Sequence, residues 1–228
     1  MTLQTSILSL IWLVVFGCSV GQQTLTNSDR IVFLGDSITE LGMKPSGYVT
    51  LIEDSLQQKF GSKTPEIIGA GVSGNKVPDL QGRLERDVLS KKPTIVIVYI
   101  GINDVWHFVT PGRTGTPRDD YQNGLEDIIA RIQGIGARVI LCTPSVIGEK
   151  FDGTNPQDKM LDDYSEISRN VAKKTGSVVC DLRKDFVGYL RTHNPENKEK
   201  EVLTVDGVHL NDQGNRFVAS EILKTLTQ

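Results

Sequence analysis

The sequence predicts an α/β protein in which buried parallel strands alternate with helices. Apolar segments of strand length alternate along the chain with segments whose apolar residues recur at helical spacing. This is the pattern of repeated βαβ units and a parallel sheet. The strand segments are continuously apolar, which is typical of strands that helices cover on both faces.

The first half of the chain contains three predicted strands and two predicted helices. Residues 30–34 are apolar and partly β-branched, which favours a buried strand. Residues 48–60 and 80–88 carry apolar side chains at three- and four-residue steps, which predicts amphipathic helices. Between these helices, residues 67–68 mark a short second strand. Residues 94–100, an apolar run that follows a proline, form the strongest strand segment.

The second half of the chain continues the alternation with three helices and two strands. Gly134, Pro144 and Gly176 stand shortly after three of these segments, where such residues end helices and strands. The predicted ranges are helix 125–132, strand 139–142, helix 160–171, strand 178–180 and helix 217–226. With right-handed crossovers, the segments predict a three-layer α/β/α sandwich of flavodoxin-like or Rossmann-like type, with five parallel strands.

The composition is that of one globular domain. The chain has 228 residues, of which 38% are hydrophobic and 23% charged, enough for one sizeable core. A formal net charge of −3 offers no basic excess for a phosphate backbone, so we expect no nucleic-acid partner. The glycine-rich residues 69–75 lack the spacing of a dinucleotide-binding loop, and no phosphate loop is present. Both observations count against a nucleotide-binding protein.

The N-terminus differs from the rest of the chain. Residues 7–20 form a nearly unbroken apolar run followed by Gly21, shorter than the roughly 20 residues of a membrane span. This favours a signal peptide over residues 1–21, a single mature domain over 22–228, and a secreted or periplasmic protein. No basic residue occurs before Arg30. An uncleaved membrane anchor and a lipid-modified Cys18 are therefore the alternatives, and membrane contact is expected only through this segment.

Polar segments follow the predicted strands, where open α/β sheets place their sites. Gly35-Asp36-Ser37 follows the first strand, residues 69–75 follow the second, and Gly101-Ile102-Asn103-Asp104 follows the third. Asp206-Gly207-Val208-His209 lies near the C-terminus. Taken singly, and in this order, the four segments are typical of a turn, a flexible loop, a helix cap and an aspartate–histidine pair on the surface.

Together the segments supply the parts of a nucleophilic site. A serine hydroxyl needs a base, the base needs an orienting group, and the oxyanion needs hydrogen-bond donors. A carboxylate three residues before an imidazole can accept its Nδ1–H and fix the tautomer. Of the other histidines, His193 lies in a polar stretch and is predicted to be solvated. His107 follows the third strand and is expected at most at the rim of a site.

The four segments, in this order, resemble the motif blocks of the SGNH (GDSL) hydrolase superfamily. The resemblance extends from residue 31 to the last predicted helix and implies the strand order 2-1-3-4-5. It departs from the family pattern at Gly69, where the second block often has asparagine. That departure concerns the local loop geometry and not the assignment of Gly74.

The resemblance implies a role for each matched residue. Ser37 is the expected nucleophile, His209 its base, and Asp206 the residue that orients His209. Backbone N–H groups of Ser37 and Gly74, with the side chain of Asn103, form the expected oxyanion hole. No metal and no cofactor is expected.

The implied activity is a serine esterase that hydrolyses carboxylic esters through an acyl-enzyme, with a small-molecule or polysaccharide ester as substrate. The loops over residues 110–120, 148–159 and 191–201 are polar, so a long acyl channel is not expected and acetyl groups, on carbohydrates for example, should be preferred. The alternatives are a lysophospholipase or lipase-type acylhydrolase and an inactive binding module of the same fold.

Apolar cover for the site is expected from four side chains only, which are Trp106, Phe108, Val146 and Ile147.

Three further expectations concern residues beside these blocks. Asp36 and Asp104 are expected to be structural, accepting N–H groups in their turns. Cys142 and Cys180 end strands that are neighbours in the implied order, so a disulfide between them is sterically possible. Both cysteines can equally be small buried core residues.

Overall fold

The strands of the central sheet run parallel, as predicted. The computed structural model describes residues 25–227, and within that range five parallel strands form one sheet in the order β2-β1-β3-β4-β5. The predicted order 2-1-3-4-5 is therefore confirmed. The strands are β1 (Arg30–Gly35), β2 (Glu66–Gly71), β3 (Ile95–Tyr99), β4 (Arg138–Cys142) and β5 (Val178–Cys180).

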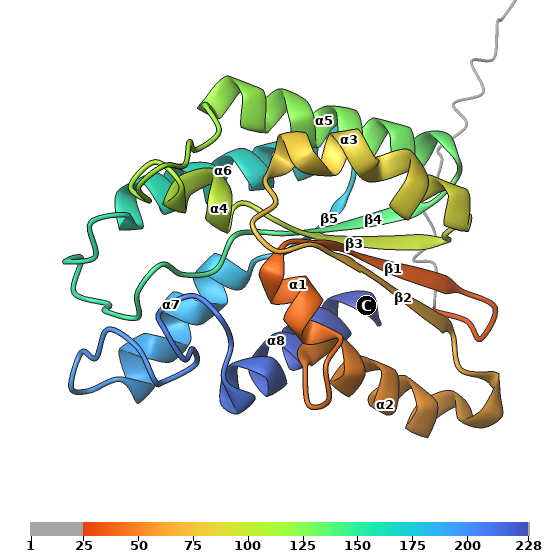
Figure 1. Ribbon diagram of the computed structural model, residues 1–228. Helices are drawn as coiled ribbons and strands as arrows, with labels where there is room; N and C mark the ends of the chain where they lie inside the picture. Colours follow the sequence, from red (N-terminus) through yellow and green to blue (C-terminus); the bar gives the residue numbers. More distant parts are fainter. Residues whose placement is uncertain (1–24, 228) are drawn as a thin grey trace, which may run out of the picture.

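Helices cover both faces of the sheet. In Figure 1, α3, α4, α5 and α6 lie on one face and α1, α2, α7 and α8 on the other, which confirms the predicted sandwich. The helices are α1 (Ser37–Gly42), α2 (Tyr48–Phe60), α3 (Val77–Asp87), α4 (Ile102–Trp106), α5 (Arg118–Gly134), α6 (Asp158–Thr175), α7 (Leu182–His193) and α8 (Asp212–Leu226). Short 3-10 turns, η1 (Gly61–Lys63) and η2 (Leu89–Lys91), follow α2 and α3.

The core lies between these layers. Every residue of β3 is buried, and in β1 only Arg30 is not, as the continuous apolar segments predict. The sheet register places Cys142 beside Cys180 on neighbouring strands. Both are buried with free thiols, so the structure shows the core alternative and not the disulfide.

The second strand is longer than predicted. Residues 69–71 belong to β2 and not to the loop after it, so the prediction of a strand limited to residues 67–68 was wrong. A Cβ on Gly69 would lie 2.5 Å from the side chain of Met43, and one on Gly71 would lie 2.2 Å from the backbone nitrogen of Glu40. These glycines therefore let α1 pack directly on the strand.

Three helices were not predicted from the sequence. The six residues of α1 and the five of α4 are too few to show helical periodicity. The missed signal for α7 is the four-residue spacing of Leu182, Phe186 and Leu190, all of them buried.

The predicted signal peptide over residues 1–21 lies outside the described residues, and its cleavage stays a prediction. The boundary of the mature domain at residue 22 stays one as well. Between residues 25 and 227, none of the helices has the length and apolar character needed to span a membrane.

Candidate functional site

The carboxyl ends of β1, β2 and β3 bring the predicted site residues together. Ser37 is the first residue of α1, immediately after β1. Gly74 lies in the turn between β2 and α3, and Asn103 lies in α4 after β3. His209 reaches the same place from the segment before α8. The predicted convergence at this edge of the sheet is what the structure shows.

Ser37, His209 and Asp206 form a continuous chain of contacts. The distance between Ser37 Oγ and His209 Nε2 is 2.9 Å, and that between His209 Nδ1 and Asp206 Oδ2 is 2.7 Å. Because the carboxylate accepts the Nδ1–H, Nε2 of the neutral ring is left to accept the serine proton. The arrangement can therefore deprotonate the Ser37 hydroxyl as it attacks.

Asp206 is fixed by its own turn. Its Oδ1 accepts the N–H groups of Val208 at 2.9 Å and His209 at 2.8 Å, while Oδ2 faces the ring. Partial burial by itself would raise the pKa of Asp206, but these hydrogen bonds outweigh burial and lower it below the usual value. The carboxylate therefore stays charged at neutral pH and can stabilise an imidazolium.

The turn that carries Gly74 is tied to its surroundings on three sides. Asn103 Nδ2 donates to the carbonyl oxygen of Asn75 at 3.1 Å. Arg83 Nε donates to Asn75 Oδ1 at 2.7 Å. The carboxylate of Glu40 accepts both the N–H and the hydroxyl of Ser73.

Gly74 itself has a φ of +79°, a left-handed conformation that favours glycine. Asn103 is buried and keeps a second amide N–H for a ligand. Arg83 also donates to the carbonyl oxygen of Gly35 at 2.8 Å, two residues before Ser37. One buried guanidinium therefore holds both the serine turn and the Gly74 turn.

Two buried carboxyl groups lie beneath the site. Asp36 Oδ1 accepts the N–H of Ile38 at 2.9 Å and caps α1. Asp104 Oδ1 accepts the N–H of Val77 at 3.0 Å, and so joins α4 to α3 rather than closing its own turn. Burial raises the pKa of Asp36 to about 7 and that of Asp104 to about 6, and the neighbouring Asp104 charge adds to the effect on Asp36.

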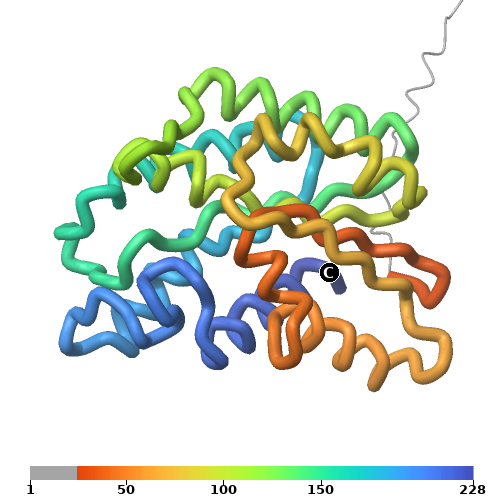
Figure 2. Tube along the Cα trace, in the orientation of Figure 1, coloured from red at the N-terminus to blue at the C-terminus, as the bar shows by residue number. Residues whose placement is uncertain are grey.

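The segment that carries Asp206 and His209 rests on the loop after β4. The buried Glu149 side chain accepts the N–H groups of Val202 at 2.7 Å and Leu203 at 2.6 Å. The N–H of Gly148 donates to the carbonyl oxygen of Gly207 at 2.8 Å. In Figure 2 the two segments run along the same side of the molecule.

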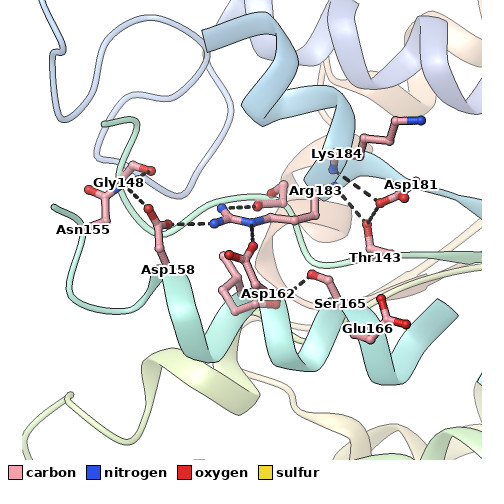
Figure 3. Close-up of polar contacts among 12 residues, drawn as sticks. Thr143, Gly148, Asn155, Asp158, Asp162, Ser165, Glu166, Asp181, Arg183 and Lys184 are labelled. Carbon is pink, nitrogen blue, oxygen red and sulfur yellow. Dashed lines mark hydrogen bonds and ion pairs between the residues drawn. The ribbon is translucent and has the colours of Figure 1, made fainter. Parts of the chain in front are cut away.

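That loop is anchored in turn by Arg183 of α7 (Figure 3). The buried guanidinium donates to Asp158 at 2.9 Å and Asp162 at 2.7 Å, both on α6, and to the carbonyl oxygen of Ser145 at 3.2 Å. Asn155 then links Asp158 at 3.1 Å to the carbonyl oxygen of Gly148 at 3.4 Å. Ion pairs between the buried Arg183 of α7 and two aspartates of α6 thus fix the backbone that supports His209.

Ser37 and His209 open into a cavity of about 360 Å³. The start of α1, the turn after β2, α4 with the segment that follows it, and the segment before α8 supply its lining. The lining residues are Ser37, Ser73, Gly74, Asn103, Trp106, His107, Thr110, Arg113 and His209. A larger cavity of about 570 Å³ beside α7 contains none of the predicted site residues. Among residues 25–227, no cluster of three or more His, Cys, Asp or Glu side chains is arranged to hold a metal ion.

The apolar cover predicted for the site is only partly present. Trp106 lines the cavity, but Val146 and Ile147 are buried in the core, because the loop after β4 folds inward. Phe108 points its exposed ring into a separate cavity. His107, expected at most at the rim, is a buried part of the cavity wall, whereas His193 is exposed as predicted.

The residues that sequence reasoning missed are the supports. Glu40, Arg83, Glu149 and Arg113 hold or line the site, but in the sequence each is one charged residue among many. Only their contacts in the fold distinguish them from surface charges.

Comparison with known proteins extends over nearly the whole described chain. The GDSL-like lipase/acylhydrolase family pattern matches residues 33–217. An acetylxylan esterase of Geobacillus stearothermophilus is 29% identical in an alignment 215 positions long that covers 88% of this chain and 94% of that protein. An isoamyl acetate-hydrolyzing esterase 1 homolog of Rattus norvegicus is 26% identical in an alignment 212 positions long that covers 83% of this chain and 78% of that protein.

A solved structure shares the fold in detail. The crystal structure of the acetyl xylan esterase AlAXEase aligns with a TM-score of 0.83 and 46% identity, covering 86% of this chain and 98% of that one.

Proposed function

Because the chain belongs to the GDSL-like lipase/acylhydrolase family and is a hydrolase of ester bonds, we propose that it is a secreted serine esterase that removes short acyl groups, acetyl above all, from carbohydrates. The observation that carries the proposal is the chain of contacts from Asp206 through His209 to Ser37, at 2.7 and 2.9 Å. A nucleophile, a base and an orienting carboxylate in that relation are the requirement for acyl transfer.

The proposed reaction begins when Ser37 Oγ attacks the ester carbonyl carbon and His209 Nε2 takes its proton. The resulting oxyanion accepts hydrogen bonds from the N–H groups of Ser37 and Gly74 and from the Asn103 amide. The bond from carbon to the alcohol oxygen then breaks, and His209 returns the proton to that oxygen. Asp206 stabilises the imidazolium between these two transfers.

Water completes the cycle. It attacks the acyl-enzyme while His209 removes its proton, and the second tetrahedral intermediate collapses with release of the carboxylic acid. His209 gives the proton back to Ser37 Oγ. Ser37, His209 and the attacking water account for every proton transfer and both nucleophilic attacks, so the proposed cycle uses no metal and no cofactor.

The preference for a short acyl group is supported by the lining of the cavity. Most of its side chains are polar, and Trp106 is the large apolar one. An additional methylene gains about 0.8 kcal/mol only when it is buried against apolar surface. Two relatives are named as an acetylxylan esterase and an acetyl xylan esterase. These names support acetyl as the acyl group and a carbohydrate as the alcohol of the substrate.

The test measures acetate release from acetylated xylooligosaccharides by the chain without residues 1–21. Wild-type protein should release acetate, and Ser37→Ala, which lacks the attacking oxygen, should lose nearly all activity. Activity of Ser37→Ala within tenfold of wild type would contradict the nucleophile assignment.

Two other substrates decide between the alternatives. Faster cleavage of a lysophospholipid than of acetylated sugars would support the lipase-type reading. Binding of xylooligosaccharides without hydrolysis of any ester would support an inactive binding module.

A further inference from the structure

The wall of the catalytic cavity beside Gly74 is formed by two nitrogen-rich side chains. Arg113 Nη1 lies 3.1 Å from His107 Nε2. The same Nη1 would lie 3.1 Å from a Cβ placed on Gly74. Both side chains line the cavity that contains Ser37 and His209. The guanidinium therefore stands directly beside the predicted oxyanion-hole glycine.

The position of the guanidinium is set by neighbouring groups. His107 is buried, and its backbone N–H donates to the carbonyl oxygen of Asn103 at 3.1 Å. Burial, with the nearby charges of Arg113 and Lys76, lowers the pKa of His107 below its usual value. The ring is then neutral at pH 7 and accepts a hydrogen bond from Arg113. The backbone N–H of Arg113 donates to the carbonyl oxygen of Thr110 at 3.1 Å, which closes the turn that presents the side chain.

The stereochemistry of the tetrahedral intermediate indicates what this wall faces. The reacting carbon carries Ser37 Oγ, the oxyanion, the alcohol oxygen and the acyl carbon. The alcohol oxygen must lie toward His209 to receive its proton, and the oxyanion lies toward Gly74 and Asn103. The acyl carbon takes the remaining direction, away from His209.

The fold separates these directions. His209 comes from the segment before α8, on one face of the sheet (Figure 1). Gly74 precedes α3, and the segment with His107 and Arg113 joins α4 to α5, all of them helices of the opposite face. The Arg113 wall therefore lies on the side of the cavity away from His209, which the oxyanion and the acyl group share.

We infer that Arg113, braced by His107, limits the length of the acyl group and so makes this enzyme selective for acetyl over longer acyl esters. On this inference, an acetyl methyl is short enough to leave the guanidinium hydrated. A longer chain would strip water from the charged group without offering it a hydrogen bond, which is unfavourable. The inference rests on the proposed function and adds to it the specificity-determining residue.

The test compares kcat/KM for p-nitrophenyl acetate, butyrate and hexanoate in wild type, Arg113→Ala and Arg113→Gln. Arg113→Ala should raise the hexanoate-to-acetate ratio at least tenfold. Arg113→Gln is shorter but can still donate to His107, so its ratio should lie between those of Arg113→Ala and wild type. The control is Arg86→Ala, since Arg86 is an exposed residue on α3, and its ratio should equal that of wild type.

The ratio distinguishes the possible failures. If kcat/KM falls by the same factor for all three esters in both Arg113 variants, Arg113 does not face the acyl group and the inference is wrong. The Arg113 variants can also be tested for acetate release from acetylated xylooligosaccharides. If that activity falls while the hexanoate-to-acetate ratio stays at the wild-type value, Arg113 lies on the alcohol side, and the inference is again wrong. A wild-type protein inactive on every ester would instead overturn the proposed function.

Discussion

At the scale of single residues, the site contains one aspartate with a lowered pKa and another with a raised pKa. Asp206 has a lowered pKa because three hydrogen-bond donors surround its carboxylate, whereas burial raises the pKa of Asp36 to about 7. The two aspartates both flank the proposed nucleophile and base, yet only Asp206 contacts the imidazole. A sequence pattern cannot show this difference, because burial and hydrogen-bond donors come from the fold.

Asn103 offers the clearest single-residue prediction. Its side chain is the proposed third donor to the oxyanion, a contact that strengthens as charge develops on the oxygen. Asn103→Ala should therefore lower kcat by roughly 10²–10³-fold, measured with p-nitrophenyl acetate under saturation. Because Asn103 also holds Asn75, circular dichroism and thermal unfolding should accompany the kinetics. A raised KM with unchanged kcat would mean that Asn103 binds the ground state instead.

Asp36 predicts a pH dependence of stability. Since its pKa is raised from 3.8 to about 7 in the folded protein, the folded state binds this proton more tightly than the unfolded state. The contribution of Asp36 to the free energy of unfolding is then most favourable below pH 4 and is lost as the pH rises to about 7. Asp36→Asn keeps the cap on Ile38 without the titration.

The measurement for Asp36 is urea unfolding at pH 5.0, 6.0 and 7.5 in wild type and Asp36→Asn. The advantage of the variant over wild type should grow from pH 5.0 to 7.5. Taking the difference between the proteins removes contributions of groups such as His107, whose lowered pKa acts in the opposite direction. A difference that stays constant with pH would show that Asp36 is ionised throughout.

At the scale of elements, the sequence predicts the hydrophobic segments better than the parts that support the site. The buried strands and the long amphipathic helices were predicted because their periodicity is local. The end of β2 was not predicted, because Gly69 and Gly71 in the sequence resemble a loop. Only the fold shows that these glycines let α1 pack against the strand. The loop after β4 reads as polar and open, yet it is anchored by Glu149 and Arg183.

Glu149 gives the element-scale prediction. Its carboxylate accepts two backbone N–H groups of the segment before Asp206, and an amide in its place can accept only one of them. Glu149→Gln should lower the free energy of unfolding by about 1–3 kcal/mol, the range for a buried group left unsatisfied. The expected kinetic effect is a lower kcat with a smaller change in KM, because His209 is held less firmly.

The matched control is Glu196→Gln, an exposed residue that pairs with Lys198 at 3.0 Å. Urea unfolding and steady-state kinetics should leave this variant indistinguishable from wild type. If Glu149→Gln behaves in the same way, the loop after β4 does not support the catalytic segment.

At the scale of the whole molecule, the site depends on strand order. Ser37 and His209 are 172 residues apart in sequence. They meet because Ser37 follows β1, an interior strand of the sheet, and the segment before α8 returns to the carboxyl end of that strand. Periodicity alone indicates a parallel sheet but no order. The resemblance of the four motif blocks supplied the order 2-1-3-4-5, and the structure confirms it. The lining residues Arg113 and His107 have no motif and emerge only from the assembled fold.

The central claim is that Ser37 is the activated nucleophile of this ester hydrolase. The most direct measurement is the intact mass of the protein after reaction with a fluorophosphonate, followed by peptide mapping. Ser37 Oγ should displace fluoride and form one P–O bond, adding one phosphonyl group on the peptide that contains Ser37, and Ser37→Ala should remain unmodified. An unmodified wild type, or equal labelling of Ser37→Ala, would contradict the account.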